Sequence, residues 1–119
     1  MINARTKGNQ GERDWRTILN KKFGTRYERT PLSGGMDLKG DVRKAFGSKP
    51  SIIDEYHWEV KRVEKINIHN CFHQAVRDAR NNTTPVVAFR KNSDQWKICI
   101  DAEDFLNILL ELEELRGDY

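Results

Sequence analysis

The feature that most constrains the fold is a short segment, residues 55–62, in which apolar and polar side chains alternate. Its sequence is EYHWEVKR. Tyr56, Trp58 and Val60 form one set, and His57, Glu59 and Lys61 form the other. Successive side chains of a β-strand point to opposite faces, so each set shares one face. We therefore expect a strand whose apolar face meets the core. Glu59 and Lys61 then lie side by side on the opposite face, about 7 Å apart along the strand.

Periodicity elsewhere in the chain predicts a mixed α/β domain. Apolar residues recur at helical spacing in residues 9–24, 67–81 and 102–116, and Asp101 is placed to cap the last of these helices. Short strands are predicted over residues 26–32, 41–46, 85–91 and 95–100, in addition to 55–62. The order of these elements indicates a central mixed sheet of about five strands flanked by helices.

A length of 119 residues predicts a single domain over residues 1–119. Residues 1–8 are polar and basic, and we expect them to form a mobile arm. The sequence contains no apolar run near the roughly 20 residues that span a bilayer, and its first residues lack a secretory signal. These features predict a cytoplasmic protein without a membrane partner.

Charge is distributed unevenly along the chain. Residues 101–119 contain seven carboxylates and one arginine, a net charge of −6, whereas the whole chain carries +3 and the remainder therefore +9. A basic body with an acidic final segment is typical of a nucleic-acid-binding protein whose last helix faces away from the nucleic acid. The alternative is that these charges only solvate the surface.

The histidines, cysteines and tryptophans are interpreted more simply. Cys71 and Cys99 have no zinc spacing and are expected to be reduced, partly buried thiols. His69 and His73 are four residues apart on a predicted helix but lack a third metal ligand. The three tryptophans fall at core-patterned positions, and packing is the interpretation we favour for them over base stacking.

The functional interpretation of Glu59 and Lys61 depends on an acidic residue that precedes them in the sequence. Asp41 follows Gly40 at the start of a predicted strand, where a glycine lets a ligand approach the backbone closely. Two carboxylates with several waters suit Mg²⁺, which activates water and stabilises charge on a phosphodiester. A Glu-x-Lys pair by itself is also common as a surface ion pair. It indicates a metal site only together with other residues such as Asp41.

The ordered set Asp41, then Glu59-x-Lys61, resembles the signature of the PD-(D/E)XK nucleases. The opening Lys7-Gly8-x-x-Gly11-Glu12-Arg13 and the segment from Arg29 to Gly34 are similar to those of the archaeal- and phage-type Holliday junction resolvases. The resemblance covers roughly residues 5–90. It implies a restriction-endonuclease-like fold and a Mg²⁺-dependent endodeoxyribonuclease that resolves four-way junctions, with Mn²⁺ as an expected substitute.

The resemblance also implies roles for single residues. Asp41, Glu59 and the backbone carbonyl of Val60 would bind the metal, and Glu12 would hold it through water. Lys61 would position the attacking water, and Ser33 would lie near the scissile phosphate. Asp37 is the alternative to Asp41. The implied DNA contacts are Arg5, Lys7, Arg13, Arg29, Lys39, Arg62, Lys65 and Gln74.

Extra apolar residues on the last helix, Ile108 and Leu110, predict a partner surface, and a second copy of the chain suits a nearly two-fold symmetric junction. Two other functions stay open at this point. One is a PD-(D/E)XK nuclease that acts on flaps, nicks or duplex DNA. The other is a DNA-binding module without catalysis. If the gene is phage-borne, the compartment is the host cytoplasm.

Overall fold

A computed structural model describes the backbone of residues 4–29, 42–44 and 49–119, and the side chains of residues 10–28 and 49–119. The elements are α1 (Ala4–Phe23), β1 (Tyr27–Arg29), β2 (Val42–Lys44), a 3-10 helix η1 (Ile52–Glu55), β3 (Tyr56–Arg62), α2 (Ile68–Asp78), β4 (Thr84–Arg90), β5 (Lys97–Ile100) and α3 (Ala102–Arg116). The predictions for Ser33, Asp37, Lys39 and Asp41, and for the side chains of Arg5, Lys7 and Arg29, lie outside the described residues.

The strands form two sheets within the described part of the chain. β3 pairs in parallel with β4, and β5 pairs antiparallel with the far side of β4, giving a mixed three-stranded sheet. β1 and β2, each three residues long, pair antiparallel with each other. The mixed α/β class is confirmed, but the prediction of one sheet of about five strands is wrong for the described residues. Alternation within a strand fixes its faces and not its neighbours, so sequence could not reveal this division.

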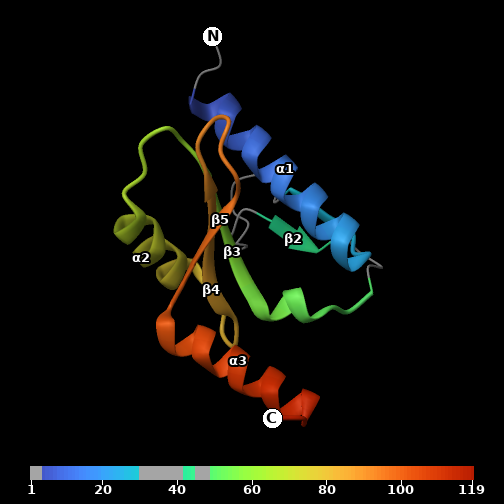
Figure 1. Cartoon of the computed structure of the whole chain (residues 1–119). Coiled ribbons are helices and arrows are strands. Elements are labelled where there is room, and N and C mark those ends of the chain that lie inside the picture. The colour runs from blue at the N-terminus through green and yellow to red at the C-terminus, as the bar shows by residue number, and fades with distance from the viewer. Residues whose placement is uncertain (1–3, 30–41, 45–48) are drawn as a thin grey trace.

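Two helices cover opposite faces of the three-stranded sheet, as Figure 1 shows for α1 and α2. On the α1 face the core contains Trp15, Leu19, Tyr27, Ile53, Val60 and Ala88. Trp15 is its centre, with ring centroids 5.5 Å from Trp58 and 5.2 Å from Trp96. The interpretation of the tryptophans as packing residues is therefore confirmed.

The first helix begins at Ala4 and not near residue 9, so the predicted mobile arm overlaps the helix. Its other end is fixed by Gly24, which adopts a left-handed conformation (φ 67°). The Asn20 side chain then ties the next strand to the helix. Its amide donates to the carbonyl of Tyr27, and its Oδ1 accepts from the Tyr27 backbone at 2.7 Å.

A 3-10 helix that was not predicted precedes β3. Ser51 and Asp54 form a capping box, in which the Ser51 hydroxyl accepts from Ile53 and the Asp54 carboxylate accepts from the Ser51 backbone. The Tyr27 hydroxyl donates to the same carboxylate. The start of β1 and the segment that leads into β3 are thereby held together.

The last helix, α3, matches its predicted range of residues 102–116. Asp101 caps it by accepting hydrogen bonds from the backbones of Glu103 and Asp104, and Gly117 ends it in a left-handed conformation. None of its residues is buried, and Figure 1 shows it across one end of the sheet. Within the described residues, no helix is long and apolar enough to cross a membrane.

Candidate active site

The polar face of β3 carries a buried carboxylate between two basic side chains. Glu59 is only 2% exposed. Its Oε1 lies 3.4 Å from Lys61 Nζ, and its Oε2 lies 3.8 Å from His57 Nε2. His57 is also buried, and its Nε2 has no hydrogen-bond partner in the described part of the protein. The strand alternation thus brings His57, Glu59 and Lys61 together as predicted.

Burial of Glu59 requires a physical reason. An ionised carboxylate loses its hydration inside a protein, at a cost of several kcal/mol unless charges and hydrogen bonds replace the water. Lys61 supplies one opposite charge and retains 29% of its own exposure, so the ammonium group reaches solvent while it faces Glu59. An apolar residue at position 59 would satisfy the fold more cheaply, which indicates a chemical role for the carboxylate.

Helix α2 covers this polar face. Its Asn67 cap accepts from the Asn70 backbone, and Ala75 is completely buried against the sheet. The Cys71 thiol lies close enough to Glu59 and Lys61 for the charges of both side chains to act on it. Burial raises its pKa, Lys61 lowers it, and Glu59 raises it further. Cys71 therefore belongs to the surroundings of the polar face and stays a protonated thiol at neutral pH.

Gln74, which is one of the predicted DNA contacts, is half-buried on α2. It follows Cys71 by three residues, so the two side chains lie on the same side of the helix. This places Gln74 near the face of β3 that carries Glu59, although it shares no described hydrogen bond with it.

Helix α1 reaches β3 at its far end through a glycine. A Cβ atom built on Gly11 would lie 2.7 Å from the Cβ of Arg62, closer than real contacts allow. Gly11 therefore lets α1 approach the residue that directly follows Lys61. Glu12, the next residue of α1, is half-buried. Gly11 of the resolvase-like motif thus contacts the end of β3 on the face opposite Glu59 and Lys61, because Arg62 shares a face with Val60.

Arg62 and Asn92 join the end of β3 to the turn between β4 and β5. Arg62 Nη2 donates to Asn92 Oδ1 at 3.3 Å, and the Asn92 backbone donates to Glu64 Oε1 at 3.0 Å. Two further nitrogens of Arg62, Nε and Nη1, are buried without a hydrogen-bond partner in the described chain. Arg62 therefore has a structural contact, and these two nitrogens are not exposed at the surface.

The other predicted DNA contacts are spread over the surface. Arg13 and Lys65 are exposed. The structure does not bring them together with Glu59 and Lys61 in a described contact.

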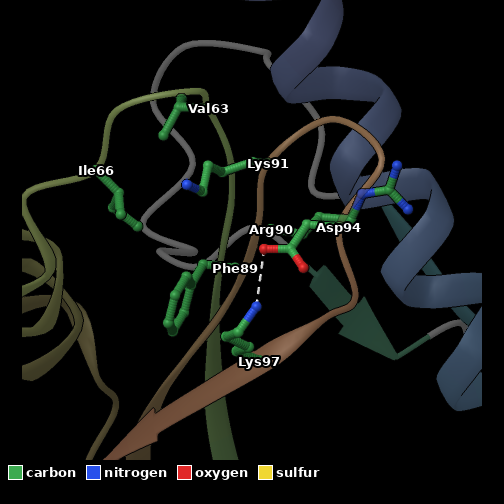
Figure 2. A pocket seen from close by; sticks show the side chains of 7 residues that line it. All are labelled: Val63, Ile66, Phe89, Arg90, Lys91, Asp94 and Lys97. Carbon is green, nitrogen blue, oxygen red and sulfur yellow. Dashed lines mark hydrogen bonds and ion pairs between the residues drawn. The ribbon is translucent and has the colours of Figure 1, made fainter.

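A hollow of about 310 Å³ lies beyond the end of β3 (Figure 2). Its lining residues are Val63, Ile66, Phe89, Arg90, Lys91, Asp94 and Lys97. In Figure 2 the Asp94 carboxylate pairs with Lys97, whose Nζ lies 2.8 Å from Oδ2. The Arg90 guanidinium points to the other side of the hairpin, 5.8 Å from the ring centroid of Trp96.

Among the described side chains, no group of three histidine, cysteine, aspartate or glutamate residues could hold a metal. Glu59 and the neighbouring Val60 carbonyl supply the oxygen donors that a hard cation prefers. The donor chemistry fits the predicted metal, and the second carboxylate, at position 41, lies outside the described part of the protein.

The sequence placed His57 on the face of Glu59 but did not reveal that both side chains are buried there. The basic residues around the hollow were not predicted as a group either. Their signal is the strand register, because Lys61 pairs with Phe89, and Phe89 pairs with Lys97. Register depends on tertiary pairing, which a single sequence does not reveal.

Comparison with known proteins places this geometry in context. Residues 3–116 match a family model described as "Phage putative PDDEXK endonuclease". The chain is also similar to Protein D14 of Escherichia phage T5, with 32% identity over 120 residues that cover 87% of this chain and 74% of that protein. No solved structure matches.

Proposed function

Because the chain belongs to the phage PD-(D/E)XK endonuclease family, we propose that it is a structure-selective DNA endonuclease that resolves four-way junctions. The observation that carries the proposal is the buried Glu59 carboxylate, 3.4 Å from Lys61 on the strand where the family signature places Glu-x-Lys. The proposed place of action is the cytoplasm, which is that of the host if the gene is phage-borne.

The proposed metal is Mg²⁺, with Mn²⁺ as a substitute. Glu59, the Val60 carbonyl and Asp41 would bind it directly, and Glu12 would bind it through water. When bound, the metal activates a water molecule and stabilises the charge that develops on the phosphodiester. Lys61 contributes a cation that orients the nucleophile towards phosphorus, and Ser33 is assigned to the phosphate.

DNA is held mainly through its backbone. The proposed phosphate contacts are Arg5, Lys7, Arg13, Arg29, Lys39, Arg62 and Lys65, with Gln74 as a neutral contact near the site. Such contacts give affinity without sequence choice, which suits an enzyme that selects shape. The exposure of Arg13 and Lys65 supports this part of the proposal.

The junction as substrate is supported by the resolvase-like motif on α1, of which Gly11 packs against Arg62 at the end of β3. A duplex-cutting enzyme on the same scaffold would share Glu59 and Lys61, whereas the glycine and glutamate on α1 belong to the resolvase resemblance. Flap, nick or duplex cleavage is therefore the second candidate.

Two paired cuts require two active sites, and α3 provides a surface for a second copy. Its large apolar side chains are exposed over more than one side of the helix: Phe105, Leu106, Leu109, Leu110, Leu112 and Leu115. An antiparallel pair of α3 helices would cover them and set the acidic first turn of each helix near Arg116 of the other. Sedimentation analysis is expected to give a dimer at micromolar concentration, and Leu109→Glu a monomer. A monomeric wild type would refute this surface.

The activity is tested by incubating a labelled four-way junction and its matching linear duplex with Mg²⁺. Wild-type protein is expected to nick the junction in pairs and to leave the duplex intact. Glu59→Gln should remove cleavage, and the exposed control Glu55→Gln should retain it. Equal cutting of both DNAs would support the second candidate. Tight binding without cleavage under Mg²⁺ or Mn²⁺ would indicate a DNA-binding module and refute the nuclease.

A further inference from the structure

The cross-strand register places the hollow directly beside the proposed catalytic lysine. Lys61 on β3 pairs with Phe89 on β4, and Phe89 pairs with Lys97 on β5. Residues that pair across neighbouring strands point to the same face, so the three side chains form one row. Adjacent strands are about 4.8 Å apart, so the row extends about 10 Å from Lys61 to Lys97.

The hollow combines an apolar floor with a basic rim. Val63, Ile66 and Phe89 provide the floor, and Phe89 is half-buried, so one part of its ring is accessible. Lys91 and Lys97 provide the rim, as Figure 2 shows. A volume of about 310 Å³ suits one small ligand. An aromatic ring beside lysines is the combination that binds a base together with its phosphates in single-stranded nucleic acid.

Asp94 keeps the rim in place. Its carboxylate accepts a hydrogen bond from Lys97 Nζ at 2.8 Å and one from the Gln95 backbone. The bond from Lys97 is the main reason that the pKa of Asp94 is lowered. Lys97 is thereby held on the rim of the hollow while it remains exposed to an incoming phosphate.

We propose that this hollow binds one unpaired nucleotide of the DNA next to the scissile phosphate, with its base on Phe89 and its phosphate at Lys97 or Lys91. This inference rests on the proposed nuclease function, since Lys61 marks where cleavage occurs. A base inside a regular duplex is stacked on both sides and cannot enter, whereas a base at a branch point is unstacked at lower cost. The hollow would therefore select branched DNA over duplex.

The inference is tested by binding measurements without divalent metal, so that cleavage plays no part. Each nucleotide near the branch point of a labelled junction is replaced in turn by an abasic residue. Wild-type protein is expected to lose affinity about five- to tenfold at one position, because one base–aromatic contact is removed. Phe89→Leu should bind the intact junction about as weakly, and the abasic position should then have no further effect.

Matched variants separate this contact from general damage. Phe23→Leu makes the same change at the end of α1 and should behave as wild type in every arm. Lys97→Gln lies outside the core, so folding is not at risk, and should weaken binding severalfold with a shallower dependence on salt. The same exposed change in Lys21→Gln should not alter the abasic profile.

Two results would overturn the proposal. One is a flat abasic profile for wild-type protein around the branch point. The other is a Phe89→Leu variant that responds to the abasic position as strongly as wild type. The nuclease is judged separately by cleavage of the intact junction with Mg²⁺. Cleavage with a flat profile refutes the hollow alone, and a position-dependent profile without cleavage refutes the nuclease alone.

Discussion

The two faces of β3 are buried to a similar extent but have opposite chemistry. Trp58 and Val60 pack against the tryptophan core beneath α1. Glu59 and His57, on the other face, lie beneath α2 and are 2% and 5% exposed. Burial alone therefore does not distinguish structure from function in this strand. The type of side chain does, because apolar burial stabilises the fold and carboxylate burial opposes it.

The comparison yields a rule for substitutions. Changes in the apolar core beneath α1 should lower stability, and any loss of activity should follow from unfolding. Changes on the α2 face should lower activity while stability is kept or gained, since sites of function store unfavourable interactions. Four experiments challenge this rule, from the largest expected effect to the smallest.

Glu59→Gln is expected to reduce junction cleavage by more than a hundredfold, because the metal loses a charged ligand. The free energy of unfolding should stay equal or rise, since the buried charge is removed and Lys61 can turn to solvent. Cleavage rates and urea unfolding measure the two effects. An unfolded or strongly destabilised variant would contradict the rule for the α2 face.

Leu19→Ala is expected to lower the free energy of unfolding by about 3 kcal/mol, because it leaves a cavity beneath the α1 face. Leu19 is 3% exposed, whereas the neighbouring Ile18 is 37% exposed. Ile18→Ala should therefore cost much less and serves as the control. Folded Leu19→Ala protein should retain its cleavage rate. A specific loss of cleavage would show that the α1 face also takes part in the chemistry.

Gly11→Ala is expected to lower stability by about 1–2 kcal/mol. The added methyl group meets Arg62, and this clash outweighs the better helix propensity of alanine. Cleavage should fall as well, because α1, which carries the proposed metal residue Glu12, is displaced from the end of β3. Thermal unfolding and cleavage of the same preparation test this. Increased stability would mean that α1 does not approach Arg62 closely.

The smallest of the four expected effects is the dependence of stability on pH that Tyr27 causes. Burial, followed by the hydrogen bond to Asp54, raises the pKa of Tyr27 above its usual value near 10. The unfolded chain then loses this proton above pH 10 while the folded protein keeps it, so stability falls as pH rises beyond 10. The slope is at most about 1.4 kcal/mol per pH unit. Urea unfolding of Tyr27→Phe should show a flatter decline.

Local patterns predicted those parts of the protein that local physics determines. The alternation of β3 and the Asp101 cap of α3 depend on neighbouring residues, and both were predicted. β3 begins one residue later than expected, and α3 has its expected bounds. The 3-10 helix at Ser51 was not predicted, although its Ser-x-x-Asp capping box is a local signal. The split of the strands into two sheets was not predicted because it depends on pairing between distant segments.

The candidate site divides in the same way. Glu59 and Lys61 were placed together because a strand puts alternate residues on one face. The contact of Gly11 with Arg62 depends on tertiary packing, which the local pattern did not contain. The row from Lys61 to Lys97 needed strand register, and neither pattern nor resemblance contained it. The roles of Asp41 and Ser33 remain predictions.

The double contact of Asn92, to Arg62 through its side chain and to Glu64 through its backbone, has a kinetic consequence. Exposed turn amides normally exchange with deuterium through small local fluctuations. The Asn92 amide donates to Glu64, so its proton should exchange more slowly while the hairpin stays against the end of β3. Its exchange rate would therefore report on contact between the hairpin and the strand that carries Glu59 and Lys61, and would fall further if bound DNA held the two segments together.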